Sequence, residues 1–157
     1  METSNGGRPS LIRDGMAQPD ISVIIPVRDG GSKFRRCLST LAAVLPSSAE
    51  MIVVADGDTD GSWNFAEEFG AQVMRIPVPQ GPAYARNLGA QSAQGDILFF
   101  IDADVVIAPD AISKVKSSFS NNPQLAALFG SYDDEPGERN FLSQYKNLIH
   151  HYVHQRS

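Results

Sequence analysis

Short apolar runs alternate with helical patterns along most of this 157-residue chain. The apolar or β-branched runs at residues 21–27, 51–54, 73–78, 97–101 and 125–132 predict five strands. The segments between them predict helices over residues 32–45, 62–69, 81–94 and 109–120, and a last helix from about residue 138. Strands that alternate with helices are joined by right-handed crossovers, so we expect an α/β, Rossmann-like, mainly parallel sheet with helices on both faces. The run at 97–101 is apolar throughout, which predicts a strand covered on both faces.

Composition limits the domain count and the classes of partner. With 42% hydrophobic and 20% charged residues, the chain resembles an ordinary globular domain, which we place at residues 20–157. Residues 1–19 contain several glycines and prolines and predict a flexible tail. A net charge of −5 without clustered Lys and Arg argues against a nucleic-acid partner.

The single cysteine and the apolar runs bear on the compartment. Cys37 falls within a helical pattern and has no cysteine to pair with, which favours a packed thiol in a reducing compartment. No apolar run reaches the roughly 18 residues of a membrane span. We therefore expect a cytoplasmic protein, with the inner face of a membrane as an open alternative.

Two carboxylates, Asp102 and Asp104, follow the fourth apolar run. On a strand this spacing puts both acids on one face, with Cα atoms roughly 7 Å apart. Two such carboxylates repel each other, so they call for a cation, a shared proton or a hydroxyl-rich ligand. Their hard oxygens suit Mg²⁺ or Mn²⁺ shared with a diphosphate. The structural alternative is a solvated turn, or a helix cap ahead of Pro109.

Other polar residues also follow predicted strands. Arg28 and Asp29 come after the first strand, and Asp56 and Asp58 come after the second. Ligands of open parallel sheets bind beyond the carboxyl ends of the strands, so these residues share a predicted site with Asp102 and Asp104. Arg86 is expected on the second turn of a helix whose free N-terminal amides favour phosphate. Its alternative role is an exposed ion pair.

Three further features have competing interpretations. The loop that begins at Asp56 matches a calcium loop, with Gly61 at its sixth and Glu67 at its twelfth position, although Asx-type turns explain it as well. His150, His151 and His154 include a pair one helical turn apart, but packing or surface contact is favoured over a metal site. Asp133 and Asp134 either border an acceptor pocket or end the fifth strand.

Four segments in order, 22–28 (SVIIPVR), 53–62 (VVADGDTDGS), 81–90 (GPAYARNLGA) and 95–104 (GDILFFIDAD), resemble the family 2 glycosyltransferases of GT-A fold. The resemblance covers about residues 20–134. It implies binding of a nucleotide diphosphate sugar, usually a UDP or GDP sugar, and transfer with inversion to a hydroxyl of a glycan or lipid. Carried over by position, the donor-binding residues are Pro26, Val27, Arg28, Asp56, Arg86, Asp102 and Ala103. Among them Asp56 receives the base and Arg86 faces the phosphates. Asp102 and Asp104 hold the ribose and the metal, with Asp104 as the direct metal ligand.

The chain departs from the family pattern in two respects. Ala55 stands where the family usually has the first of two aspartates. The family's catalytic base and acceptor elements lie farther downstream than Ser157, so no catalytic residue is identified, and we expect a donor-binding half, truncated on its C-terminal side, that transfers sugar poorly. Membrane association could arise through that downstream region.

Two other functions compete with this interpretation. One is a non-enzymatic nucleotide-binding or regulatory module. The other is a haloacid-dehalogenase-like phosphatase with Asp102 as nucleophile and Asp104 as acid, although its motif normally lies on the first strand.

Overall fold

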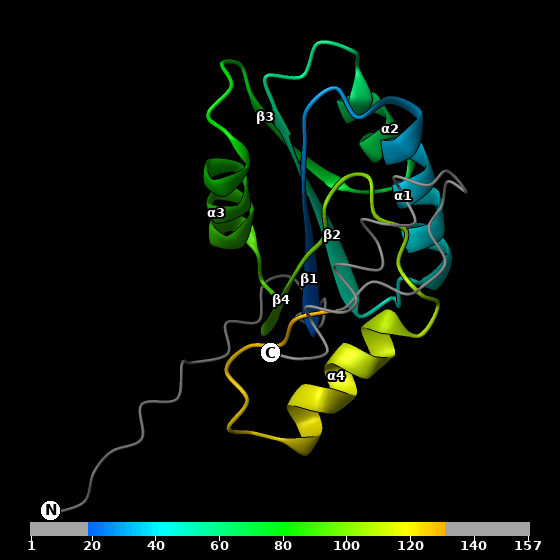
Figure 1. Cartoon of the computed structure of the whole chain (residues 1–157), viewed down its shortest axis with the longest axis vertical. Helices are drawn as coiled ribbons and strands as arrows, with labels where there is room; N and C mark the ends of the chain where they lie inside the picture. The colour runs from blue at the N-terminus through cyan, green and yellow to red at the C-terminus, as the bar shows by residue number, and fades with distance from the viewer. Residues whose placement is uncertain (1–18, 131–157) are drawn as a thin grey trace, which may run out of the picture. The chain divides into compact units, whose positions relative to one another are not determined.

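The computed structural model describes residues 19–130, which contain four strands and four helices in alternation. Figure 1 shows them in chain order as β1 (Ile21–Val27), α1 (Gly31–Val44), β2 (Ala49–Asp56), α2 (Ser62–Glu68), β3 (Gln72–Ile76), α3 (Pro82–Ser92), β4 (Ile97–Phe100) and α4 (Ala111–Asn121). The predicted elements up to residue 120 are confirmed, with ends that differ by a few residues. The largest difference is β2, which is longer than predicted because its outer residues also pair with β1.

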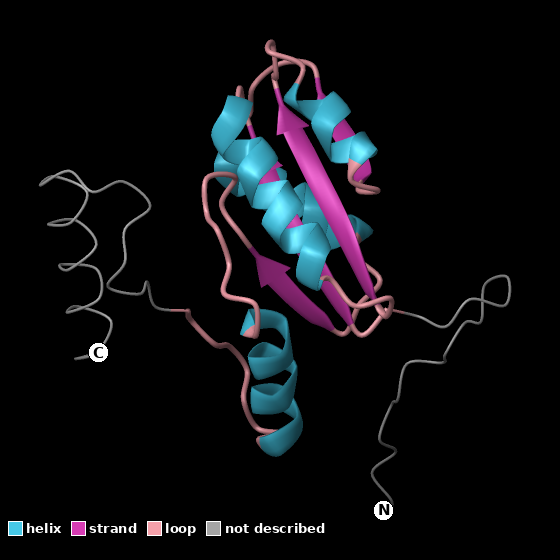
Figure 2. Ribbon diagram, turned by 90° about the vertical axis from the view of Figure 1, so that its right-hand side faces the viewer, coloured by secondary structure: helices cyan, strands magenta, loops and turns pink. Residues whose placement is uncertain are grey.

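The four strands form one parallel sheet in the order β3-β2-β1-β4. Ile21 pairs with Ala49 on β2 and with Ile97 on β4, so β1 is the central strand between them. The strand arrows visible in Figure 2 point toward the same end of the sheet. The predicted Rossmann-like α/β fold with a parallel sheet is therefore confirmed.

Helices cover both faces of the sheet. Alternate residues of β1 and β2, such as Val23 and Val53, pack with Phe34 and Leu38 of α1 in the larger core cluster. The intervening residues pack against α3, where Gly89 approaches so closely that an added Cβ would lie 2.5 Å from the Ile24 side chain. Figure 1 shows α1 and α2 on one side of the sheet and α3 on the other.

A group of hydrogen bonds holds the start of β4 at the amino-terminal end of the parallel strands. The Gly95 amide donates to Ser22 Oγ at 2.8 Å, and Ser22 Oγ in turn donates to Glu50. The Gln94 amide donates to the same carboxylate at 2.6 Å. A Cβ at Gly95 would lie 2.7 Å from backbone atoms of Ile21 and Ser22, so this close approach requires glycine.

The prediction that residues 97–101 are covered on both faces is wrong for the described part of the chain. There β4 pairs only with β1 and is an edge strand, and its Leu98 and Phe100 side chains are each 43% exposed. These two residues lie on the α3 side of the sheet, where α3 packs on β1 and β2. The apolar run therefore predicted the strand correctly, but it did not predict that one face of the strand is partly exposed.

The fifth predicted strand is also wrong over residues 125–130, which form no strand. Its last two residues, the helix predicted from residue 138, Asp133, Asp134 and the three histidines lie outside the described residues. The chain divides into two compact units, Met1–Ser117 and Ser118–Ser157. Among the described residues, no helix is both long and apolar enough to cross a membrane.

Candidate functional site

The strand order creates a topological switch point between β1 and β4. From β1 the chain continues to β2 and β3, which lie on one side of β1 within the sheet. It later returns and places β4 on the other side of β1. The strand order therefore reverses at β1, and open α/β sheets bind ligands beyond the carboxyl ends of the strands at such a point. Arg28 follows β1 at this switch point, and Asp102 and Asp104 follow β4.

Asp102 and Asp104 lie in a turn after β4 rather than on the strand itself, because β4 ends at Phe100. The Val105 amide donates to the Asp102 carbonyl at 3.0 Å and closes this turn. Ala103 and Val105 pack against the core, whereas both aspartates are exposed. The predicted strand conformation of Asp102 and Asp104 is therefore wrong, but both acids are still exposed because the alternating burial continues through the turn.

Arg86 of α3 forms an ion pair with Asp102 through Nη2 and Oδ1. The Arg86 side chain is 35% exposed and that of Asp102 is 54% exposed. This contact joins α3 to the turn after β4, across residues that are 16 positions apart in the sequence. This is the exposed ion pair that was the alternative role of Arg86, and its role toward the phosphates stays a prediction.

Cys37 of α1 lies beneath the same turn. Its thiol donates to the Asp102 carbonyl at 3.8 Å, and the residue is only 1% exposed. Burial, reinforced by the charge of Asp104, raises the pKa of the Cys37 thiol to about 11. The prediction of a packed thiol is confirmed. Asp102 is thus contacted at its backbone carbonyl by Cys37 of α1 and at its carboxylate by Arg86 of α3.

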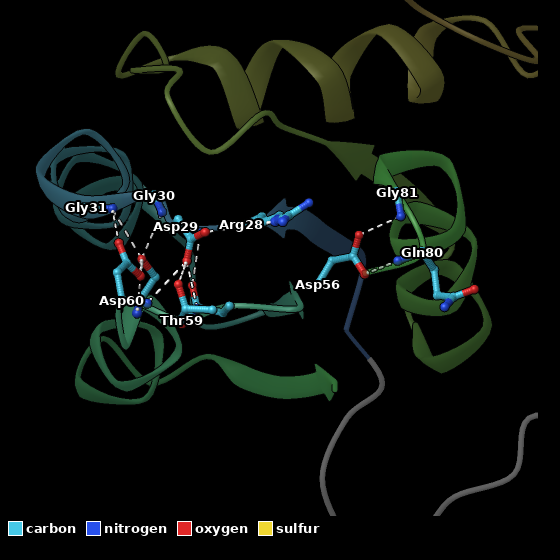
Figure 3. Close-up of polar contacts among 11 residues, drawn as sticks. Arg28, Asp29, Gly30, Gly31, Asp56, Thr59, Asp60, Gln80 and Gly81 are labelled. Atoms are coloured by element: carbon cyan, nitrogen blue, oxygen red, sulfur yellow. Dashed lines mark hydrogen bonds and ion pairs between the residues drawn. The ribbon is translucent and has the colours of Figure 1, made fainter. Parts of the chain in front are cut away.

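Asp56, the last residue of β2, is 4% exposed and binds the loop before α3. Its two carboxylate oxygens accept the amides of Gln80 and Gly81, each at 2.7 Å, as Figure 3 shows. These two amides, at and just before the N-terminus of α3, are therefore already bound, and phosphate binding at this N-terminus stays a prediction. A role of Asp56 in binding a base stays a prediction, and it would use the remaining lone pairs of the carboxylate.

A second polar group joins the loop after β1 to the loop after β2. Asp29 accepts the Thr59 amide at 2.7 Å, the Thr59 hydroxyl at 2.9 Å and the Asp60 amide at 3.2 Å. In return Asp58 accepts the Asp29 amide, and Asp60 accepts the Gly31 amide, at 3.1 and 3.0 Å. Figure 3 shows Asp29, Thr59 and Asp60 of this group apart from Asp56. We call Asp29, Asp58, Thr59 and Asp60 the interloop clasp.

The clasp shifts the acidity of its three carboxyls in different directions. The bonds from Thr59 lower the pKa of Asp29, and those from Ser62 are the largest cause of the lowered pKa of Asp60. Burial, helped by the adjacent Asp60, raises the pKa of Asp58, whose Oδ2 atom is buried without a hydrogen-bond partner in the described residues. One oxygen from each acid lies within 4.8 Å of the others, so the clasp could also hold a cation.

The clasp overturns the calcium-loop interpretation. A calcium loop needs Asp56, Asp58 and Asp60 to converge on one ion. Instead Asp56 is bound to the loop before α3, and the residue that joins Asp58 and Asp60 is Asp29. Asp29 was expected at the site without an assigned partner, because nothing in the local sequence signals a partner about 30 residues away.

The remaining predicted donor-binding residues differ in exposure. Pro26 and Val27 are buried residues of β1, and the Val27 side chain belongs to the core, so ligand contacts of Val27 would come from its backbone. Arg28 is exposed and approaches Asp29 at 3.9 Å. Ala103 is half-buried between the two aspartates. Their roles toward a nucleotide stay predictions.

A cavity of about 470 Å³ lies near the carboxyl ends of β2 and β3, and the sequence analysis did not predict it. Its lining residues are Ala55, Asp58, Arg75, Ile76 and Pro77. The guanidinium of Arg75 is also stacked on the ring of Trp63 at 4.1 Å. This cavity is on the side of β2 away from β4, so it does not include the Asp102–Asp104 turn.

Asp102 and Asp104 offer a donor set that fits a divalent cation. Both side chains are exposed, and carboxylate oxygens are the ligands that Mg²⁺ and Mn²⁺ prefer. Among the described residues Asp104 makes no hydrogen bond or ion pair, whereas one oxygen of Asp102 is bound to Arg86. The turn could therefore hold a cation mainly through Asp104, with the second oxygen of Asp102 available beside it.

Known proteins with similar sequences and folds bear on this geometry. An uncharacterized glycosyltransferase of Haemophilus influenzae is 32% identical over 122 residues, which cover 74% of this chain and 48% of that protein. The mannosyltransferase PcManGT from Pyrobaculum calidifontis, in complex with GDP-Man and Mn²⁺, has a TM-score of 0.66 at 21% identity and matches 88% of this chain and 41% of its own. S. aureus TarS 1-349, in complex with UDP-GlcNAc, has a TM-score of 0.63 at 21% identity and matches 74% of this chain and 39% of its own.

These comparisons establish the family of the chain, but they cover only part of each relative. The chain spans about half the length of the H. influenzae relative. The two structures, at 21% identity, show the fold alone. The model of glycosyl transferase family 2 matches residues 22–156, almost the whole chain. The parallel sheet, the exposed Asp102–Asp104 turn and this match together show that the chain belongs to glycosyl transferase family 2.

Proposed function

We propose that this chain is the donor-binding part of a glycosyltransferase that uses a nucleotide diphosphate sugar, a UDP or GDP sugar, and a divalent cation. The full protein transfers the sugar to a hydroxyl of a glycan or lipid with inversion at the anomeric carbon. The observation that carries this proposal is the position of Asp102, Asp104 and Arg86 at the switch point between β1 and β4. Similar folds have been solved with UDP-GlcNAc and with GDP-Man and Mn²⁺, which supports the same chemistry.

Each group at the switch point has a separate role in this proposal. Asp104, with Asp102, holds Mg²⁺ or Mn²⁺, which when bound stabilises the negative charge on the leaving diphosphate. Arg86 supplies a second positive charge to the phosphates from α3. Arg28, Asp56, Ala103 and the end of β1 contact the nucleoside. A general base within hydrogen-bond reach of the acceptor hydroxyl completes the reaction, and no residue of this chain is assigned to it.

A thermal-shift panel with UDP, GDP, CDP and TDP, each with and without Mn²⁺, tests the proposal. A ligand that binds the folded state raises the melting temperature, so we expect a shift with UDP or GDP that depends on Mn²⁺. Asp104→Asn should abolish the metal-dependent part of the shift. Asp58→Asn is the matched control, because it removes one carboxylate from the interloop clasp and leaves the Asp102–Asp104 turn intact.

Two results would reject the proposal. One is the absence of a shift with every nucleotide in the presence of Mn²⁺. The other is loss of the metal-dependent shift in Asp58→Asn but not in Asp104→Asn, which would move the cation to the clasp. Rapid sugar transfer by the isolated chain would contradict the assignment of the catalytic base to another part of the protein.

A further inference from the structure

The ion pair between Arg86 and Asp102 occupies one of the two carboxylates proposed to serve a cation. The guanidinium reaches from α3 to Oδ1 of Asp102, and 35% of the Arg86 side chain remains exposed. In α3, Arg86 directly follows Ala85, which is fully buried against β1 and β2. The backbone of this residue is therefore held by the sheet, while its side chain can turn at the surface.

The charges of this group are unequally paired. Asp102 has Arg86 as a counter-ion, whereas Asp104 has no ion-pair partner in the described residues. A guanidinium and a divalent cation that share one carboxylate repel each other, because like charges a few ångströms apart disfavour one another. Arg86 and a metal ion therefore compete for Asp102.

A diphosphate changes this balance. It offers Arg86 a new anionic partner, and guanidinium groups bind phosphate oxygens as well as carboxylates. Once Arg86 contacts the diphosphate, Asp102 is released to the cation. The nucleotide and the metal then favour each other's binding, which is a coupling of two sites through one shared side chain.

On the basis of the metal site proposed above, we propose that Arg86 is a positioning residue that holds Asp102 as an internal counter-ion until the nucleotide arrives. This arrangement makes the binding of the metal alone weak and the joint binding of metal and nucleotide cooperative. Cys37 supports it from the other side of the turn, since its thiol contacts the Asp102 carbonyl and limits the change to the carboxylate side chain.

The inference predicts opposite effects of one substitution. Exposed ion pairs are worth little, so removal of Arg86 should tighten the binding of Mn²⁺ alone by only about two- to fivefold. In the presence of saturating Mn²⁺ the same removal should weaken UDP or GDP binding, because the diphosphate loses its arginine. A residue that merely stabilised α3 would not change the two affinities in opposite directions.

The test uses the full 157-residue chain with Mn²⁺ alone as the probe, measured by electron paramagnetic resonance at low ionic strength. The variants are Arg86→Met, which removes the charge, and Arg86→Lys, which keeps it. Arg35→Met is the matched control, because Arg35 is also a surface arginine in an ion pair, with Glu68, and is 53% exposed. Nucleotide affinity is measured by calorimetry with Mn²⁺ present, and thermal melting checks that each variant is folded.

We expect tighter Mn²⁺ binding in Arg86→Met, values near wild type in Arg86→Lys and Arg35→Met, and weaker nucleotide binding in Arg86→Met. Unchanged or weaker Mn²⁺ binding in Arg86→Met would overturn the inference, and so would equal tightening in Arg35→Met, which would indicate a general charge effect. Both results leave the proposed function standing if the wild type binds nucleotide with Mn²⁺. No Mn²⁺ binding by any variant, with or without nucleotide, would reject the metal site and this inference together.

Discussion

Asp56 is the residue whose loss should have the clearest structural cost. It is 4% exposed, and each of its carboxylate oxygens accepts one backbone amide at 2.7 Å. In Asp56→Asn the remaining carbonyl oxygen can accept only one of these amides. The new amide group is a donor that faces a second donor, so one hydrogen bond is lost and the other loses its charge.

The magnitude follows from these two bonds. A hydrogen bond to a charged group contributes about 1.5–3 kcal/mol, and loss of charge on the second bond costs roughly 1 kcal/mol. We therefore expect Asp56→Asn to lower the free energy of unfolding by about 3 kcal/mol. The matched control is Asp102→Asn, because Asp102 is 54% exposed and makes one ion pair. Its loss should cost about 0.2–1 kcal/mol.

Urea unfolding measured by the fluorescence of Trp63, the single tryptophan, provides the assay. The cost should appear without any ligand, which separates a structural role from a role in nucleotide binding. A loss below about 1 kcal/mol in Asp56→Asn, or an equal loss in both variants, would refute the argument from the two buried bonds.

Three further predictions concern stability and reactivity. Gly95→Ala should lower the free energy of unfolding by about 1–3 kcal/mol, because its Cβ would lie 2.7 Å from the backbone of β1; a neutral effect in urea unfolding would show that the turn yields easily. Asp58→Asn should stabilise the protein increasingly as pH rises from 3 to 7. In the wild type, the raised pKa of Asp58 favours its protonated form in the folded state. The free energy of unfolding of the wild type therefore falls as pH rises above the usual aspartate pKa of about 3.9 and through the raised one, and the variant avoids this loss. Calorimetry at pH 3 and pH 7 measures this effect. At pH 7 the free energy of unfolding of Asp58→Asn should exceed that of the wild type by about 0.2–1 kcal/mol, and an equal gain at pH 3 would contradict the explanation. Cys37, with a pKa raised to about 11, should resist alkylation by iodoacetamide at pH 8 until urea unfolds the chain, and labelling at the rate of a free thiol would show that α1 opens locally.

Local sequence was sufficient for most of the elements. The largely apolar run of β1 and the spacing of Phe34, Cys37, Leu38 and Leu41 on α1 are each patterns within a single element. These periodicities predicted the alternation of strands and helices, and that alternation predicted the parallel sheet. The position of polar residues at the carboxyl ends of strands followed from the same pattern.

Local sequence was not sufficient for the cover of each strand. Leu98 and Phe100 belong to an apolar run that is typical of a buried strand. Each is nevertheless 43% exposed, because β4 is at the edge of the described sheet. Residues 125–130 are likewise apolar enough to predict a strand and form none. An apolar run reports the tendency to be buried, whereas burial itself depends on which other segments pack there.

The sequence by itself determined which residues of this protein carry charge and near which end of the sheet they lie. Only the tertiary structure decided their partners: Arg86 with Asp102, Asp29 with Thr59 and Asp60, and Asp56 with the loop before α3. These pairs join residues 16 to 31 positions apart, and they depend on the strand order β3-β2-β1-β4. A strand order is selected by the packing of the whole sheet rather than by any one segment. A chemical group can therefore be predicted from the sequence, while its counter-ion is known only once the strands have been placed.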